Sequence, residues 1–241
     1  MTEEPPISRR RPRTRLEPPA LGRIDPSLGI PIGRQIYRTL RRALMAGRIG
    51  AAEGLSIRAI AESLGVSPAP VRDALKQLEA SDILEARHKS AFFVPRVDAD
   101  TFDQLQAVRV ELEGFAAGQT ALQADDRDFR IIDDAANRYL DAIHSNPADA
   151  VAANHAFHFA IYHASRNPIL VNLIEILWLR MGPLLASASP AYDHGAARDC
   201  HRDAVQAIRQ RDSAAACDAI RRDILDAGKS IRTALFGPTS A

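Results

Sequence analysis

Residues 55–78 read L-S-I-R-A-I-A-E-S-L-G-V-S-P-A-P-V-R-D-A-L-K-Q-L, and this stretch decides the fold of the first part of the chain. Ser56 is a typical helix N-cap, and apolar residues follow it at helical spacing. Gly65 is expected to end that helix, because glycine tolerates the left-handed backbone found at many helix ends. Ser67 is then expected to cap a second helix with its own apolar stripe. Two short helices joined by a tight glycine turn predict a helix-turn-helix.

Two basic residues of the second helix, Arg72 and Lys76, lie off its apolar stripe and can face a phosphate or a base edge. The alternative is an ordinary helical hairpin with solvated basic side chains. The distribution of charge along the chain favours the first interpretation, contact with nucleic acid. Residues 1–96 carry 17 Lys and Arg against 10 Asp and Glu, whereas residues 97–241 carry 14 against 20. A basic first part and an acidic second part suggest a nucleic-acid module joined to a different kind of domain.

The flanking segments extend this motif to a domain over residues 30–96. Residues 31–49 predict a helix with one apolar face, which Gly47 ends. The β-prone runs Ile83–Leu84 and Ala91–Val94 predict a small hairpin. A helix, a helix-turn-helix and a β-hairpin together make a winged helix-turn-helix. The expected tip of the wing is His88, Lys89 and Ser90.

The N-terminal segment, residues 1–29, is rich in Pro and Arg and has few apolar residues, so it is expected to be a disordered basic arm. It is either a solvated tail or an arm that adds non-specific phosphate contacts. The rest of the composition is that of a soluble protein, with 46% hydrophobic and 25% charged residues. We find no hydrophobic signal core and expect no membrane-spanning run. Cys200 and Cys217 have no metal-motif spacing, so we expect a reduced, cytoplasmic location.

Residues 97–238 predict an all-α antiparallel bundle, so the chain as a whole is mainly α. A long helix is expected from Asp98 or Asp100 to about Leu122. Pro, Asn and Gly breakers separate the helices that follow. These are expected at residues 125–145, 147–166, 168–188, 196–210 and 212–235.

Several polar side chains of this bundle are expected to point inward, because each lies on the apolar face of its helix. Burying such groups is costly unless they bind a ligand or one another. A single inward histidine is more often a hydrogen-bonded core residue than a ligand, so the pattern alone leaves both possibilities open. The residues concerned are Arg109, Asn154, His158, His201 and Asp223.

The chain resembles the GntR family of transcription regulators, and within it the FadR subfamily with its FCD effector domain. In the first part the motifs are I-Y-R-T-L-R-R-A-L-M-A-G-R-I (36–49), S-L-G-V-S-P-A-P-V-R-D-A-L (63–75) and L-E-A-S-D-I-L-E (78–85). In the helical part they are R-V-E-L-E-G-F-A-A (109–117), N-H-A-F-H-F-A-I (154–161), A-S-R-N-P-I-L (164–170) and H-R-D-A-V-Q-A-I (201–208). A bundle of about six helices resembles the VanR-like form of this domain.

The resemblance implies a homodimer that binds double-stranded operator DNA. The positions that match the family's DNA contacts are Arg58, Ser67, Ala69, Arg72, His88 and Lys89. This chain has Pro68 and Ala69 where relatives often carry Arg or Thr, and Ser90 where they often carry Gly. Losing an arginine at the start of the recognition helix removes a guanine or phosphate contact. We therefore expect the preferred operator to differ from that of arginine-bearing members.

The resemblance also implies a divalent metal in the helical domain. Many members hold one with an Asp-x3-His pair and a histidine from each of two later helices. The matching positions here are Asn154, His158, His201 and Asp223. This set keeps one carboxylate, but at its last position, Asp223, and not at its first, Asn154. It contains two imidazoles where the family's usual set has three. Zinc, nickel or manganese would fit, and oxygen-preferring ions are favoured relative to the usual set. A metal-free polar pocket is the alternative. His155 is a candidate supporting residue for this site. Five apolar or aromatic residues are expected to be core residues that could also form pocket walls: Phe115, Phe157, Tyr162, Leu177 and Trp178.

Arg109 matches a family arginine that pairs with an effector carboxylate, as suits a guanidinium fork. Its alternative is a structural ion pair with Glu111, Glu113 or Asp223. The sequence thus predicts a transcription regulator, a repressor by preference, controlled by a small organic acid. The second hypothesis is a metal-dependent enzyme fused to a DNA-binding module, although no HExxH motif is present. The third is a non-specific architectural DNA protein, which leaves the inward polar residues unexplained.

Overall fold

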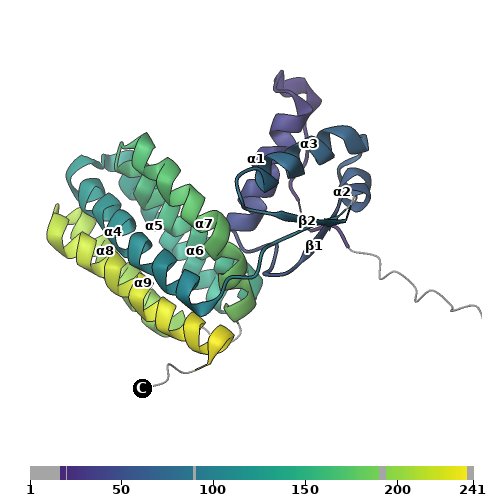
Figure 1. The fold of residues 1–241 in the computed structure, drawn as a ribbon. Coiled ribbons are helices and arrows are strands. Elements are labelled where there is room, and N and C mark those ends of the chain that lie inside the picture. Colours follow the sequence, from purple (N-terminus) through teal and green to yellow (C-terminus); the bar gives the residue numbers. More distant parts are fainter. Residues whose placement is uncertain (1–16, 20, 89–90, 190–193, 238–241) are drawn as a thin grey trace, which may run out of the picture.

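The computed structural model describes residues 17–19, 21–88, 91–189 and 194–237 and is mainly α, as predicted (Figure 1). The first part of the chain forms a winged helix-turn-helix. Its elements are α1 (Ile32–Met45), β1 (Gly54–Ser56), α2 (Ile57–Leu64), α3 (Pro68–Glu79), β2 (Glu85–His88) and β3 (Ala91–Phe93).

The helix-turn-helix forms as its capping residues predict. The Ser56 hydroxyl accepts a hydrogen bond from the Ala59 N–H at 3.3 Å. Gly65 has φ +65°, the left-handed conformation that ends α2. Ser67 occupies the N-cap position of α3, but its side chain makes no capping hydrogen bond. Its hydroxyl therefore remains available to another acceptor or donor.

The wing is part of a three-stranded antiparallel sheet with the order β1-β3-β2. β1 pairs Leu55 with Phe92 and was not predicted, because three residues are too few to show an alternating pattern. The expected first strand is displaced: Ile83 and Leu84 are buried core residues, and β2 begins directly after them. Lys89 and Ser90 lie outside the described residues.

The segment before α1 is structured, which corrects part of the predicted disordered arm. Pro26–Leu28 form one 3-10 turn capped by Asp25. The Gln35 side chain accepts from the Asp25 N–H at 3.0 Å and donates to the Asp25 carbonyl at 2.8 Å. Leu21 and Ile24 also pack against the core. Partly buried hydrogen bonds with one glutamine thus order a segment whose composition alone suggested a tail. Residues 1–16 and 20 lie outside the described residues.

Six helices make up the second part within its described residues, 97–189 and 194–237, and they lie close to the predicted spans. They are α4 (Ala99–Gln123), α5 (Asp126–Ile143), α6 (Pro147–Ala164), α7 (Pro168–Ala188), α8 (His194–Arg209) and α9 (Ser213–Phe236). Asp98 caps α4, accepting from the Thr101 N–H. Gly195, expected to separate two helices, lies instead within α8.

Helix α7 corrects the expectation that no apolar run could span a membrane. An 18-residue window of Pro168–Ala188 has a mean hydropathy of 1.7, but 56% of that window is buried inside the protein. A buried core helix meets the same criterion.

A second correction concerns Phe115, which was expected to be a core residue: its side chain is 50% exposed on α4.

Helix α7 also joins the bundle to the DNA-binding domain, because it packs directly on α1 (Figure 1). Arg41 and Glu175 form an ion pair of 2.6 Å across this joint. A Cβ added at Gly182 would lie only 2.2 Å from the Leu44 carbonyl oxygen, so glycine is required for this approach. The Ala51 N–H donates to the carbonyl of Pro183 at 3.3 Å. The two domains are therefore in direct backbone contact.

Candidate DNA-binding surface and metal centre

Three of the predicted DNA contacts lie around the start of α3. Ser67, Ala69 and Arg72 are all exposed, whereas the apolar stripe of α3 is buried. Arg58, on α2, has a side chain 88% exposed and an ion pair with Glu62 at 2.7 Å. An exposed pair of this kind is weak, so the guanidinium can exchange it for a phosphate. The side chain of His88 and all of Lys89 lie outside the described residues.

The five polar residues predicted to point into the bundle are all buried. Their exposed fractions are 4% for Arg109, 7% for Asn154, 1% for His158, 2% for His201 and 3% for Asp223. They come from four helices. Helical spacing therefore correctly predicted that each of these side chains points into the bundle. Such a set needs internal partners or a ligand.

Three of them, His158, His201 and Asp223, come together as a possible metal-binding group. His158 Nε2 lies 3.1 Å from Asp223 Oδ2, and His201 Nε2 lies 3.6 Å from Asp223 Oδ1. One ligand atom from each residue lies within 4.8 Å of the others. In a tetrahedral zinc site with metal–ligand bonds of about 2.0–2.2 Å, neighbouring ligand atoms are roughly 3.3–3.6 Å apart. The two separations between a histidine nitrogen and an Asp223 oxygen are close to this size.

The orientation of His158 supports the same conclusion. The Tyr162 hydroxyl donates to the Glu113 carboxylate, so its oxygen accepts from His158 Nδ1 at 2.8 Å. In a neutral imidazole, Nε2 then carries a lone pair. That lone pair faces an oxygen of Asp223, an arrangement that is unfavourable unless a proton or a cation lies between them.

Several atoms around this group are buried and have no hydrogen-bond partner among the described residues. They are Asn154 Oδ1, Asp223 Oδ1 and both ring nitrogens of His201. Unpaired buried polar atoms are rare in proteins, and an ion or a ligand is one of the explanations for them. Asn154 lies one turn before His158 on α6, so its amide oxygen belongs to the same face.

The protonation states of His201 and Asp223 also suit a cation. Burial lowers the pKa of the His201 imidazole and so favours its neutral form. Burial acts to raise the pKa of the Asp223 carboxyl, but His201 and His158 together hold it below its ordinary value. Neutral imidazoles and an ionised carboxylate are the forms that bind divalent metals.

Glu113 is a buried residue of this centre that the sequence analysis considered only as an ion-pair partner of Arg109. Its fully buried carboxylate accepts from Arg109 Nε at 2.6 Å, from Trp178 Nε1 at 3.1 Å and from the Tyr162 hydroxyl. Arg109 also donates to Gln106 at 2.9 Å. Arg109 therefore forms the structural ion pair with Glu113 that was the alternative to effector binding. Its role in effector binding stays a prediction. A glutamate on the inward face of α4, four residues after an inward arginine, was the available signal.

Other predicted pocket residues have packing roles. Phe157 stacks on the His201 ring with centroids 4.0 Å apart, and Trp178 lies 5.5 Å from the His158 ring. His155, considered as a supporting residue, packs on Trp178 and Phe159, and its Nε2 has no partner among the described residues. Burial and the nearby His158 and His163 lower the pKa of His155 to about 4.

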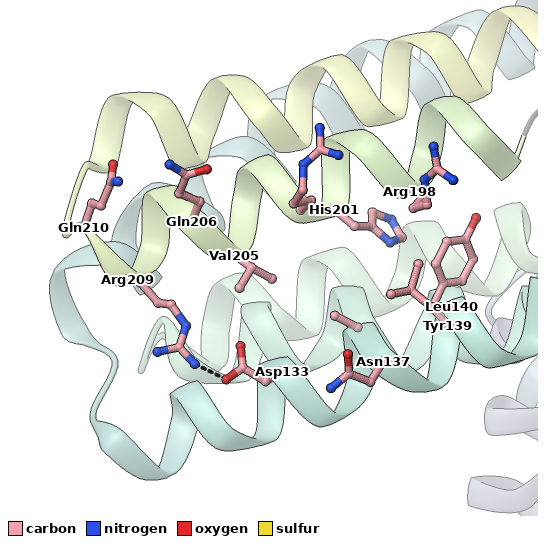
Figure 2. Close-up of a pocket in the computed structure, with 12 residues that line it drawn as sticks. Asp133, Asn137, Tyr139, Leu140, Arg198, His201, Val205, Gln206, Arg209 and Gln210 are labelled. Carbon is pink, nitrogen blue, oxygen red and sulfur yellow. Dashed lines mark hydrogen bonds and ion pairs between the residues drawn. The ribbon is translucent and has the colours of Figure 1, made fainter.

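A cavity of about 650 Å³ lies beside this centre, between α5 and α8 (Figure 2). His201 and Tyr139 line it, together with Leu140 and Val205. The fold and the site together are those of a winged-helix DNA-binding protein whose helical bundle has a polar centre able to hold a small ligand.

Comparison with known proteins identifies both parts. Residues 32–94 match the family described as bacterial regulatory proteins, gntR family, and residues 104–226 match the FCD domain. The chain is 32% identical over 150 residues to the HTH-type transcriptional regulator McbR of Escherichia coli, covering 62% of this chain and 68% of McbR. It is 28% identical over 147 residues to the uncharacterized regulator YdhC of Bacillus subtilis, covering 60% of this chain and 66% of YdhC.

Solved structures agree with the sequence matches. The structure of E. coli McbR/YncC has a TM-score of 0.74 at 26% identity, covering 81% of this chain and 94% of that one. A GntR regulator from Rhodococcus sp. RHA1 has a TM-score of 0.65 at 19% identity, covering 83% and 96%, and supports the fold alone. The chain belongs to the GntR family of bacterial regulatory proteins and carries an FCD domain. It is a DNA-binding transcriptional regulator, and its curated relatives are regulators too.

Proposed function

We propose that this regulator is a homodimeric, cytoplasmic repressor rather than an enzyme, and that a divalent metal and a small organic acid control its operator binding. The observation that carries this proposal is the group His158, His201 and Asp223, with unpaired buried atoms around it. The candidate metals are zinc, nickel and manganese, because two imidazoles, a carboxylate and the Asn154 amide form a mixed nitrogen and oxygen set. A bound cation would neutralise the buried carboxylate of Asp223.

On the DNA side, Arg72, Arg58, Ser67 and Ala69 supply the exposed recognition surface, with His88 and Lys89 of the wing as further contacts. Two such surfaces, one from each copy, would read the two halves of a pseudo-palindromic operator. Ala69 cannot donate a hydrogen bond to a base, so base reading at this end of α3 falls mainly on Arg72.

An exposed apolar strip on α4 and α7 supports dimerisation. Val108, Phe115 and Leu122 recur every seven residues on α4 and are 47%, 50% and 56% exposed. The neighbouring α7 adds Ile169 and Leu173, which are 74% and 46% exposed. A seven-residue repeat is the spacing at which one helix packs along another, so a second copy would cover this strip.

The path from the metal centre to the DNA-binding domain follows α7. Through Tyr162, His158 is linked to the Glu113 carboxylate, and Glu113 also holds the indole N–H of Trp178 on α7. One turn further along α7, Gly182 and Pro183 contact the backbone of the DNA-binding domain. A ligand that prefers one position of His158 would therefore favour one position of this joint, and it shifts the equilibrium only by its differential affinity for the two states.

Metal analysis of the full-length protein tests the first step. Protein purified without chelator should contain about one divalent ion per chain, the stoichiometry of a single structural site. The H158A/H201A variant should contain none. Its matched control, H144A/H163A, alters two exposed histidines and should retain the metal. Equal metal content in the two double variants would remove the assignment of this site.

A further inference from the structure

The helical bundle is open along one seam. α5 packs mainly on α6, and α8 packs mainly on α9, whereas α5 and α8 contact each other little. The cavity of about 650 Å³ occupies this seam, and its lining side chains come from α5, from α8 and from Gln210, which directly follows α8 (Figure 2). Small-molecule sites have volumes of about 300–1,000 Å³. We call this cavity the α5–α8 groove.

The lining of the α5–α8 groove combines an apolar strip with a basic rim. Ala136 and Leu140 of α5 and Val205 of α8 supply the apolar part, and Leu140 is 36% exposed. Arg198 and Arg202 supply the basic rim. This is the chemistry that recognises a molecule with an apolar body and an anionic group.

The two rim arginines are free to exchange partners. Their side chains are 50% and 66% exposed, and they pair with Asp199 at 3.3 Å and 3.1 Å. Arg202 also lies 3.6 Å from Asp203. Exposed pairs contribute little to stability, so a ligand carboxylate can replace them at low cost. Arg209, at the other end of the groove, is instead tied across the seam to Asp133 (Figure 2).

The base of the α5–α8 groove borders the proposed metal centre, with which it shares His201. Tyr139 and His201 line the groove, although their side chains are only 1% and 2% exposed, and their ring centroids are 4.6 Å apart. A molecule in the groove would therefore lie against His201. Arg109, by contrast, does not line the groove, and its guanidinium is engaged by Glu113 and Gln106.

We propose that the α5–α8 groove binds a small carboxylic acid with an apolar body, with the carboxylate at Arg198 and Arg202 and the body along Leu140 and Val205. The proposal rests on the proposed function, because it specifies the class of the effector and the place where it binds. The effector carboxylate would thus bind the arginines at the rim of the groove, and not the buried Arg109 that the sequence analysis proposed.

The test measures binding of benzoate by NMR titration to full-length protein, with two probes as controls. Acetate keeps the carboxylate without the body, and benzyl alcohol keeps the body without the charge. Benzoate should bind at least about tenfold more tightly than either, since both parts of the site contribute. Benzoate that binds no more tightly than acetate contradicts the proposal.

Two variants locate the binding. V205W fills the groove, and R198Q/R202Q removes the rim charge without changing the buried core. Each should weaken benzoate binding at least about tenfold, the effect of losing a charge-assisted contact or of blocking a site. The matched controls are A214W on α9 and R130Q on α5, both exposed and outside the groove. Wild-type affinity in R198Q/R202Q, or in a folded V205W, would overturn the proposal.

The same proteins separate this inference from the proposed function. If the variants bind benzoate normally while metal still changes operator affinity, the groove assignment fails and the proposed function stands. If benzoate binds in the groove but neither benzoate nor metal changes operator affinity, the groove assignment stands and the proposed function fails.

Discussion

Replacing Tyr162 with phenylalanine tests whether the buried hydrogen bonds around Glu113 hold His158 ready to bind a metal. The tyrosine hydroxyl accepts from His158 Nδ1 at 2.8 Å and donates to Glu113. Phenylalanine keeps the ring, which is fully buried. The substitution therefore removes one oxygen atom from a packed interior.

The magnitude follows from the groups that lose a partner. His158 Nδ1 loses its acceptor, whereas Glu113 keeps Arg109 and Trp178 as donors. A buried group left without its partner costs about 1–3 kcal/mol of stability. Losing the partner that orients a metal-ligating histidine costs about 10–100-fold in metal affinity. We expect Y162F to remain folded and to bind zinc about 10–100-fold more weakly than the wild type.

The assay is a chelator competition that measures zinc affinity, together with chemical denaturation that measures the free energy of unfolding. Tyr37→Phe is the matched control, because Tyr37 lies on α1 in the DNA-binding domain. Y162F that is folded and binds zinc as tightly as the wild type would refute the role given to this hydroxyl.

Three further predictions concern other parts of the molecule. Arg72→Ala should weaken binding to an operator selected in vitro by about 1–3 kcal/mol, the usual value of a specific base contact, while Arg130→Ala should leave the Kd from fluorescence anisotropy unchanged. Gly182→Ala places a Cβ against the α1 carbonyls and should cost about 1–3 kcal/mol of unfolding free energy in a urea titration. Gly22→Ala, which meets no atom within 4 Å, should cost much less. Phe115→Glu should convert the proposed dimer to a monomer in light scattering after size exclusion, and a dimer that persists at micromolar concentration would rule out the α4–α7 strip as its interface.

The fold was largely predictable because its signals are local. Ser56 and Gly65 set the ends of α2 through capping and a left-handed backbone. Proline and asparagine breakers set the ends of the bundle helices to within a few residues. β1 escaped prediction because its three residues are defined by pairing with β3, which is distant in sequence. The ordered segment at Asp25 depends in the same way on a side chain ten residues later, Gln35.

The candidate site was predictable in its residues but not in its connections. Helical spacing placed His158, His201 and Asp223 on inward faces, and the structure brings them together. No spacing rule reveals that Tyr162 and Trp178 share the carboxylate of Glu113, because those contacts join three helices. Phe115 was misjudged for a related reason. An apolar residue on a helix can face another copy of the chain as readily as its own core.

The account's central claim is that the His158, His201 and Asp223 centre controls operator binding. The most direct test is the operator Kd of the full-length protein, measured by fluorescence anisotropy with zinc and with a chelator, for the wild type and for H158A/H201A. We predict a change of at least about fivefold between the two conditions for the wild type, the lower end of typical coupling between sites. We predict no change for H158A/H201A, which should still bind the operator. A wild-type Kd that is the same in both conditions, or an equal response from the double variant, would contradict the account.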